Sequence, residues 1–557
     1  MDASLQTLHQ RKDVWTSVSI DERIMILDRL AKGYASVAHE WVNDCLQAKG
    51  YPRGGFTEAQ EWIAGPYVIV RFLRRLQWSL KDILKGKRPR ISGPLRTLAN
   101  GQVVAQVFPQ TVYDKLFFQG NIAEVWMKEG VTVGNLPESQ ATSYFDKNRE
   151  GKVALVLGAG NVSGIPVTDA LSKLFVEKQV VMLKLSPVNA HIGPVMEKSF
   201  SALIKPGFLR IVYGGSDEGA YLCNHVLVNE ILVTGSDKTF NSIVFGPGSN
   251  GAKRKENRDP MLRKPVTGEL GNVAPLIVVP GPWSSSDLAY QAELIASLMA
   301  DNGGQTCSIP RVMLQHASWS QRNQLLDQLR IVLAREPLRN AYYPGSQERH
   351  RIFVNAHPEA ELFGIPKEKQ LPWMLIAGLN PKNVNDICFK TEGFFGYIAE
   401  TEIEAPDTSG YIDRAVEFAN EHLWGTLSAV IVVHPASLKD KNVAVSLERA
   451  ISDLRYGTIA LNYAAGANWV VGVTPWGAFP ESDIYDIQSG CGFVHNALMF
   501  SQVQKTVLRA PFRSKPKPAW FLSRGKIGAK LFKRLVNFEL SPSILKVPAI
   551  ILQGMKD

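Results

Sequence analysis

Two residues whose side chains could take part in a reaction lie beside glycines in this chain. Cys307 follows Gly303-Gly304-Gln305-Thr306, and Glu269 lies in the run Thr267–Pro275, between Gly268 and Leu270. Glycines let the backbone approach a ligand closely, and a turn exposes a side chain. A thiol can attack an electrophilic carbon, and a carboxylate can serve as the general base. The alternative is that Cys307 is a buried, small apolar residue.

Ordered elements flank both candidates. A helix is predicted over 288–299, before the cysteine turn, and a strand over 312–314 follows it. The glutamate turn precedes a predicted strand over 276–279. A cysteine and an acid on turns between ordered elements could be held in fixed positions.

The region upstream alternates apolar runs with glycine-rich turns. Val153–Leu157 predicts a buried strand, which leads into a turn with Gly158, Gly160, Asn161 and Gly164 and then a helix over 167–176. A dinucleotide-binding strand–turn–helix has this form. Further strands are predicted over 180–183, 208–212, 226–233 and 276–279. The alternation predicts an open parallel sheet that binds ligands at the carboxyl ends of its strands.

Two features at these strand ends bear on phosphate and ribose binding. Gly235 and Ser236 open a predicted helix over 239–244, where free N–H groups could hold a phosphate. An ordinary helix cap is the alternative. The strand over 180–183 ends in Lys184-Leu185-Ser186-Pro187, without the acid that usually binds a ribose.

Other segments have recognisable periodicity. Residues 1–90 predict helices, one of them over 66–84 with Pro66 at its start, where the missing N–H has no cost. Strands are predicted over 100–109, 130–134, 427–433 and 458–461, a helix over 321–336, and a loop over 473–480.

Length and composition bound the class of protein. A chain of 557 residues predicts two or more domains, and 45% apolar and 20% charged residues are typical of a globular protein. No apolar run reaches the roughly 18 residues of a membrane span, and charges throughout the first 30 residues argue against a secretory signal. The five cysteines include no Cys-x-x-Cys pair, so we expect no metal site, no disulfide framework and a cytoplasmic location.

The net charge of +10 is partly local, because residues 505–534 hold ten Lys or Arg and no acid. No nucleic-acid motif accompanies the charge, so we expect no nucleic-acid partner. Apolar residues at helical spacing, Ile527, Leu531, Leu535 and Phe538, predict an amphipathic helix in this tail. It could contact an anionic membrane weakly or pack on its own protein.

Together these motifs resemble the aldehyde dehydrogenase superfamily over about residues 100–510. The resemblance implies that Cys307 is the nucleophile, Glu269 the general base, and Asn161 a donor to the oxyanion. For NAD or NADP it implies contacts from the residues Gly160, Lys184, Gly235, Ser236, Glu392 and Phe395. Arg311, Leu461-Asn462 and Pro475-Trp476-Gly477 also match family segments.

The sequence departs from the family pattern at three places. Phe240 replaces a glycine after the Gly235-Ser236 turn, and Pro187 replaces an acid that binds the ribose hydroxyls in many NAD-using members. Loss of that acid removes repulsion against a 2′-phosphate, so NADP is as plausible as NAD. Glu392-Gly393-Phe394-Phe395-Gly396 has one residue more than the family's Glu-x-Phe-Gly segment.

The fold implied is α/β, with a Rossmann-type parallel-sheet cofactor domain, an α/β catalytic domain and a β oligomerisation extension. The last strand of that extension, over 500–508, would add to a neighbouring subunit's sheet and give a homodimer or homotetramer. The expected divisions are 1–98 (helices of the cofactor domain), 99–150 (oligomerisation strands and connection), 151–280 (cofactor domain), 281–480 (catalytic domain), 481–510 (return and oligomerisation strand) and 511–557 (basic tail).

The implied activity is NAD(P)-dependent oxidation of an aldehyde to a carboxylic acid through a thiohemiacetal and thioester on Cys307. One alternative is a relative that forms an acyl-CoA or reduces an acyl group, although Glu269 favours hydrolysis. The other is a catalytically silent member that acts as a binding or scaffold protein.

Overall fold

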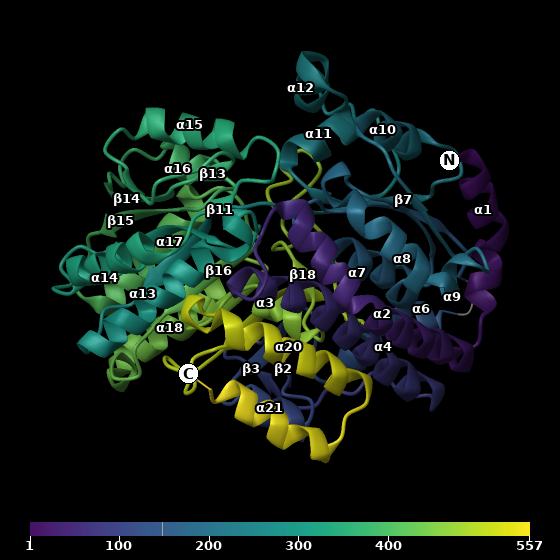
Figure 1. Ribbon diagram of the computed structural model, residues 1–557, viewed down its shortest axis with the longest axis horizontal. Coiled ribbons are helices and arrows are strands. Elements are labelled where there is room, and N and C mark those ends of the chain that lie inside the picture. Colours follow the sequence, from purple (N-terminus) through teal and green to yellow (C-terminus); the bar gives the residue numbers. More distant parts are fainter. Residues whose placement is uncertain (147–148, 557) are drawn as a thin grey trace.

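Two β-sheets lie side by side in the chain, with helices packed on their faces (Figure 1). The structure is a computed structural model that describes residues 1–146 and 149–556. Residues 147–148, in the predicted connection, and Asp557, at the end of the predicted tail, lie outside the described residues. The α/β class predicted from the sequence is confirmed.

The smaller sheet is the predicted parallel sheet. Its order is β19-β8-β7-β4-β5-β6, and all pairs are parallel except β19 with β8. The strands are β4 (Val153–Leu157), β5 (Val180–Lys184), β6 (Leu209–Val212), β7 (Glu230–Gly235), β8 (Val266–Leu270) and β19 (Gly490–Cys491). Glu269 lies near the end of β8, in a strand rather than in the turn that its glycines predicted.

The strand predicted over 276–279 belongs to the other sheet. β9 (Ala274–Val278) pairs with β10 (Pro310–His316) and β16 (Ser428–Val432) in the larger sheet. The prediction that it closes the cofactor sheet is therefore wrong, and β8 closes the parallel part instead. β9 is apolar and buried throughout, and such a strand could belong to either sheet. The chain crosses from the smaller sheet to the larger one between Leu270 and Ala274.

The larger sheet has eleven strands in the order β1-β2-β3-β21-β17-β16-β9-β10-β15-β14-β12. Its remaining strands are β1 (Leu95–Thr97), β2 (Val103–Phe108), β3 (Ile122–Met127), β12 (Glu361–Phe363), β14 (Trp373–Leu379), β15 (Tyr397–Ile403), β17 (Thr458–Leu461) and β21 (Val503–Arg509). Two further sheets have two short antiparallel strands each: β11 (Arg339–Asn340) with β13 (Gln370–Leu371), and β18 (Trp476–Gly477) with β20 (Phe493–Val494).

The strand predicted to join a neighbouring subunit joins its own chain. β21 pairs in parallel with β17 and antiparallel with β3, so β1, β2 and β3 extend the same sheet. Lys505 of β21 reinforces this closure, because its Nζ donates to the carbonyls of Ile451, Ser452 and Leu454 at 2.6–3.0 Å. The expected β-addition to a neighbour through this strand is wrong in this structure, since both edges of β21 are occupied.

The helices follow the predicted pattern in most places. Those around the smaller sheet are α1 (Asp2–Ser17), α2 (Ile20–Lys49), α3 (Phe56–Trp62), α4 (Val68–Leu84), α7 (Ile165–Leu171), α8 (Gly193–Ser199), α9 (Ser201–Ile204), α10 (Ser216–Asn224), α11 (Asp237–Phe245) and α12 (Gly248–Glu256). Those around the larger sheet are α13 (Ser285–Met299), α14 (Arg322–Arg335), α15 (Ser346–Ala356), α16 (Ile387–Lys390), α17 (Thr408–His422) and α18 (Lys441–Asp453). The short helices are α5 (Val112–Phe117), α6 (Thr142–Phe145) and α19 (Ala467–Val471).

Two local predictions are wrong. Pro66 lies inside a π-helical turn, Ile63–Tyr67, that joins α3 to α4, so it does not start a helix. A π-turn leaves room for a proline because its hydrogen bonds span a longer loop. Gly130–Gly134 is a turn, and the strand lies earlier, at β3. Two valines between glycines, Val131 and Val133, occur in turns as well as in strands, so this pattern did not predict the structure correctly.

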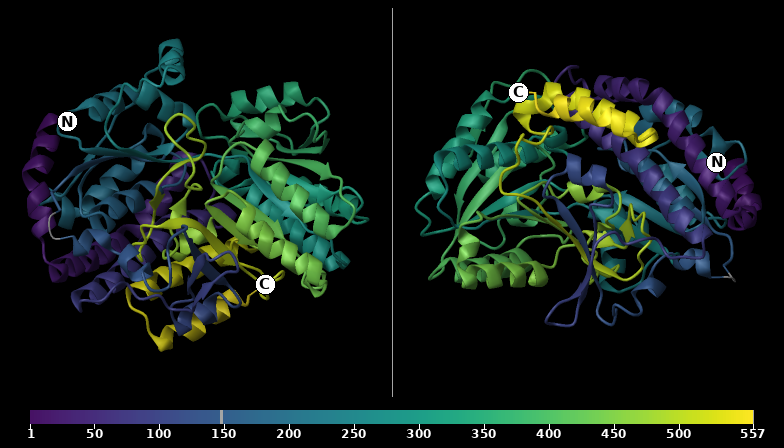
Figure 2. Two further views of the ribbon diagram at one scale, coloured as in Figure 1. Left: turned by 180° about the vertical axis from the view of Figure 1, so that it is seen from behind. Right: turned by 90° about the horizontal axis from the view of Figure 1, so that it is seen from below.

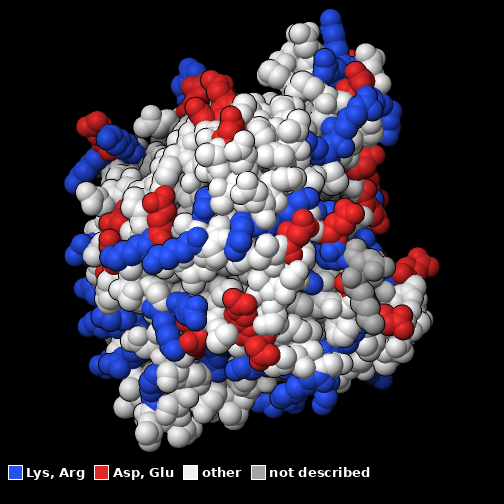
Figure 3. Space-filling model, turned by 90° about the vertical axis from the view of Figure 1, so that its right-hand side faces the viewer, with Lys and Arg blue, Asp and Glu red and all other residues white. Residues whose placement is uncertain are grey.

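The tail packs on its own protein. α20 (Gly525–Leu540) contacts α3 and α4, and α21 (Val547–Gly554) folds back on α20 (Figure 2). Ile527, Leu535 and Phe538 are buried, so the apolar face that could have entered a membrane is covered by protein. Within the described residues, no helix is long and apolar enough to cross a membrane. On the face drawn in Figure 3, basic and acidic side chains are interspersed.

Candidate active site

The cysteine turn is held in an unusual backbone conformation. Asn302, Gly303 and Gly304 have φ of 48°, 68° and 83°, a run of left-handed residues that asparagine and glycine adopt most easily. A Cβ on Gly304 would lie 2.2 Å from the backbone N of Gly396, so a larger residue would not fit there. Arg311 ties the two segments together, because it donates to the carbonyls of Gly304 and Phe395 at 2.8 Å each.

Cys307 and Glu269 meet at this turn. The thiol donates a hydrogen bond from Sγ to Glu269 Oε1 at 3.3 Å, and the indole Nε1 of Trp476 donates to the same oxygen at 3.1 Å. Cys307 is partly exposed, whereas Glu269 is 4% exposed. Glu269 lies in β8 of the smaller sheet, whereas Cys307 lies in the turn that precedes β10 of the larger sheet.

Burial governs the protonation of both groups. It raises the pKa of Glu269 to about 7, although the hydrogen bonds from Trp476 and Cys307 favour the charged form. Burial also raises the pKa of Cys307 well above its usual value, and the carboxylates of Glu269 and Glu392 raise it further. The resting pair is therefore a neutral thiol beside a carboxyl group that can take up a proton near neutral pH.

Asn161 lies at the base of the same turn. Its side-chain Nδ2 donates to the backbone carbonyl of Gln305 at 3.0 Å. The backbone carbonyl of Asn161 accepts from Asn302 Nδ2 and from the hydroxyl of Tyr342. An amide carries two N–H groups, so one remains for a substrate oxygen. The three predicted catalytic residues are therefore brought to one place.

Two groups near this site escaped the sequence analysis. Asp169, on α7, accepts from the Thr234 hydroxyl at 2.7 Å, and its other oxygen is buried without a partner. Burial raises the pKa of Asp169 to about 7, and the charge of Glu269 adds to the effect. The hydrogen bond from Trp476 to Glu269 was also missed. Neither residue lies in a sequence pattern that marks such a contact, so only the folded arrangement reveals them.

The predicted cofactor residues fall at the carboxyl ends of the smaller sheet. Lys184 ends β5, and its amine has no hydrogen-bond partner among the described residues. Gly235 ends β7 with open space around it, and Ser236 caps α11 by accepting from Thr239 N at 3.1 Å. Phe240 is fully buried below this turn and packs against Gly268, so its ring does not fill the space above the turn.

Glu392 and Phe395 have different surroundings. Glu392 Oε1 is buried without a partner, and a Cβ on Gly271 would lie 1.9 Å from its Oε2. Burial raises the pKa of Glu392 to about 8, against the opposing charge of Arg311. The ring of Phe395 lies in the core against Phe353 and Tyr397, so the structure does not bring its side chain to the glycine turn.

Phe394 occupies that position instead. Its ring centroid is 4.9 Å from that of Tyr343, and Tyr343 lies beside Gly160, where an added Cβ would be 3.3 Å from it. The extra residue after Glu392 thus places Phe394, with a φ of 56°, where the resemblance implied Phe395. An unpartnered amine, an open glycine turn and an orphaned carboxyl oxygen fit a dinucleotide that bears phosphate and ribose groups.

One cluster of metal-type ligands occurs among the described residues. His357, Asp386 and Cys388 bring donor atoms within 4.8 Å of one another. Asp386 caps α16 by accepting from Cys388 N at 2.9 Å and also accepts from His357 Nε2 at 3.1 Å. These hydrogen bonds explain why the three side chains lie close together.

The chain thus combines a parallel-sheet domain, with candidate ligand groups at its strand ends, and a cysteine–glutamate pair between two sheets. The sequence profile described as the aldehyde dehydrogenase family matches residues 169–340. An aldehyde dehydrogenase of Enchytraeus buchholzi is 36% identical over 240 residues, which are 42% of this chain and 44% of that protein. A betaine aldehyde dehydrogenase of Brucella anthropi is 25% identical over 300 residues, which are 51% and 54%.

Solved structures share the fold over most of the chain. Aldehyde dehydrogenase C of Pseudomonas syringae, in complex with NAD+ and octanal, aligns with a TM-score of 0.62 at 15% identity, covering 92% of this chain and 88% of that one. An NADP-dependent glyceraldehyde-3-phosphate dehydrogenase of Bacillus halodurans aligns with a TM-score of 0.58 at 16% identity, covering 91% and 90%. These comparisons relate residues 169–340 to the aldehyde dehydrogenase family and the overall fold to solved aldehyde dehydrogenases. It matches about half the length of the curated relatives.

Proposed function

We propose that this protein oxidises an aldehyde to a carboxylic acid with NAD or NADP, through a covalent bond between Cys307 and the substrate. The observation that carries the proposal is the 3.3 Å hydrogen bond from Cys307 Sγ to Glu269 Oε1. Both residues line the inner part of a cavity of about 730 Å³, which gives an aldehyde a route to the sulfur. The match of residues 169–340 to the aldehyde dehydrogenase family supports NAD or NADP as the cofactor.

The first step follows from this contact. Glu269 takes the proton of Cys307, and the thiolate attacks the carbonyl carbon to form a thiohemiacetal. The oxygen that becomes negative would be stabilised by the free N–H of Asn161 and by the backbone N–H of Cys307. Donors fixed in place before reaction lower the barrier because they need no reorganisation.

Lys184, Gly235, Ser236 and Glu392 would hold the cofactor. When bound, the cofactor supplies the hydride acceptor that leaves a thioester on the cysteine. Glu269, after releasing its proton, then removes a proton from water, and the resulting hydroxide attacks the thioester carbon. The carbon–sulfur bond breaks, which frees the carboxylic acid and restores Cys307.

A panel of aldehydes with both cofactors, followed by the absorbance of the reduced cofactor, tests this proposal. We expect turnover by the wild type and none by Cys307→Ala, whereas Cys388→Ala, which removes a buried cysteine of α16, should keep turnover. Acid formed without added coenzyme A would separate hydrolysis from acyl-CoA formation. No turnover by the wild type with any aldehyde would favour the silent member instead. A homo-oligomeric state and a cytoplasmic location stay predictions.

A further inference from the structure

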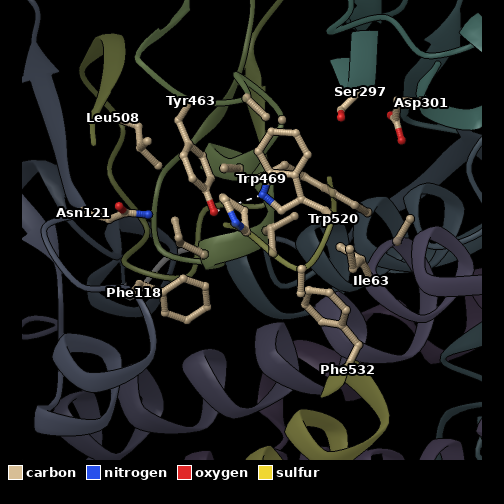
Figure 4. Close-up of a pocket in the computed structure, with 18 of the residues that line it drawn as sticks. Ile63, Phe118, Asn121, Ser297, Asp301, Tyr463, Trp469, Leu508, Trp520 and Phe532 are labelled. Atoms are coloured by element: carbon tan, nitrogen blue, oxygen red, sulfur yellow. Dashed lines mark hydrogen bonds between the residues drawn. The ribbon is translucent and has the colours of Figure 1, made fainter. Parts of the chain in front are cut away.

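The cavity at Cys307 is lined in part by the C-terminal tail. Its walls include a proline-rich stretch, residues 511–520, and both tail helices. Figure 4 shows rings from distant segments facing the same space: Phe118, Tyr463, Trp469, Trp520 and Phe532. Cys307, Glu269 and the tail thus line one cavity.

The lining toward the tail is mostly apolar, although Arg513, Lys515 and Lys517 belong to it. Several polar groups there are paired with other protein groups: Trp520 Nε1 donates to the Tyr463 hydroxyl at 3.0 Å, and Arg513 Nη1 donates to Asp287 at 2.9 Å. Arg513 Nε is buried without a partner. Lys517 is paired with Glu293. Paired groups gain little from a polar ligand, so the cavity offers a substrate chiefly apolar surface.

The tail is a fixed wall rather than a loose cover. Glu539 of α20 is buried and forms ion pairs with Arg71 at 2.5 Å and with Arg74 at 2.8 Å. A Cβ on Gly525 would lie 2.3 Å from the backbone N of Phe56, so α20 approaches α3 about as closely as two backbones can. Such close contact fixes the side chains that α20 presents to the cavity.

The rim of the cavity is also apolar. Ile551 and Met555 of the last segment line it and are 37% and 63% exposed. An apolar entrance that leads through an aromatic chamber to a thiol suits an extended hydrocarbon chain, which gains free energy with every methylene that leaves water. A small polar aldehyde would leave most of this surface without contact.

We infer that the substrate is an aldehyde with a long apolar chain, and that the tail, residues 511–555, selects it. The inference rests on the proposed function, because it concerns the aldehyde that reaches Cys307. The inference specifies the hydrocarbon part of the aldehyde. Cys307 and Glu269 contact only the carbonyl end of the substrate and do not determine that part.

The test compares propanal, hexanal and decanal in the full-length wild type. We expect kcat/KM to rise roughly hundredfold from propanal to decanal, since each buried methylene contributes to binding. The double variant Leu531→Asn, Ile551→Asn, at two partly exposed lining positions, should lower kcat/KM for decanal at least tenfold and leave that for propanal unchanged. Leu552→Asn, at an exposed position of α21 outside the lining, should change neither.

Calorimetry with 1-decanol and 1-propanol, without cofactor, gives a readout independent of turnover. We expect 1-decanol to bind the wild type and to bind the double variant at least tenfold more weakly. Turnover with a flat or inverted chain-length profile would overturn this inference and leave the proposed function standing. No turnover of any aldehyde, with 1-decanol still bound, would overturn the proposed function and keep the apolar-chain site. Equal behaviour of wild type and double variant would refute the role of the tail.

Discussion

Sγ of Cys307 lies 3.3 Å from Oε1 of Glu269, although Glu269 belongs to a strand of the smaller sheet and Cys307 to the turn before a strand of the larger sheet. A direct thiol–carboxyl hydrogen bond gives the proton of the nucleophile a defined acceptor. It also links the nucleophile and the general base, because the protonation of one group changes the environment of the other. The predictions about catalysis follow from this contact.

The first prediction concerns the pH dependence of turnover. Glu269 acts as a base only when it is ionised, and its pKa is raised to about 7, so kcat/KM should rise with pH to a plateau above that value. Glu269→Gln should lower kcat by about 10²- to 10⁴-fold and remove this rise. Steady-state kinetics between about pH 5 and about pH 9, values chosen to span the pKa by about 2 units each way, would measure both. An unchanged profile in the variant would assign the base to another group.

The second prediction concerns stability. The pKa of Glu269 is raised in the folded protein, so its ionisation costs stability as pH rises through about 7, whereas below about pH 4 the group is protonated in both states. Glu269→Gln should therefore raise the free energy of unfolding by about 1–3 kcal/mol at pH 8 and by little at low pH. Urea unfolding would measure this, with the exposed Glu404→Gln as a control. If Glu269→Gln raised the free energy of unfolding equally at both pH values, ionisation of the buried Glu269 would not be the cause.

The third prediction concerns the choice between NAD and NADP. Pro187 supplies no acid, but Glu218 lies near Lys184. Burial lowers the pKa of Lys184, and the charge of Glu218 opposes that shift. Glu218 also accepts from Gly215 N at 2.7 Å, just beyond β6. We expect this carboxylate to disfavour a 2′-phosphate. Glu218→Gln keeps the capping hydrogen bond of α10 and should raise kcat/KM for NADP relative to NAD at least several-fold. An unchanged ratio would leave Glu218 without a role in cofactor choice.

The fourth prediction concerns the anchor of the tail. Glu539→Ala removes the buried partner shared by Arg71 and Arg74, and it should lower the free energy of unfolding by about 3 kcal/mol. Glu421→Ala breaks an exposed ion pair with Arg455 and should cost less than about 1 kcal/mol. Chemical denaturation of both variants would measure the difference. Equal, small losses would show that the tail is held by its apolar face alone.

Much of the fold follows from local pattern. Val153–Leu157 is apolar throughout and bounded by glycines, and β4 has the same bounds as the prediction. The tail helix was predicted from four apolar residues at helical spacing, and α20 contains all four. These elements depend on their own residues, so a single sequence is enough to identify them.

The errors concern relations between distant segments. The residues of β9 and β21 predict strands, but not which sheet or subunit receives them, because backbone pairing depends on a partner elsewhere in the chain. Likewise, the resemblance identified Cys307 and Glu269, but the contacts of Trp476 and the orphaned oxygen of Asp169 arise only when four segments meet. The exchange of Phe394 for Phe395 follows from one inserted residue, which shifts the backbone but leaves composition unchanged.

The most direct test of the account is to trap the acyl group on the enzyme. The wild type, quenched with acid during turnover of decanal with NAD or NADP, should carry the thioester on Cys307. Mass spectrometry of the digested protein should then show a decanoyl group on the peptide that contains Cys307, and no such group on the corresponding peptide of Cys307→Ala. Reduction of the cofactor without any acyl group on Cys307 would contradict the account.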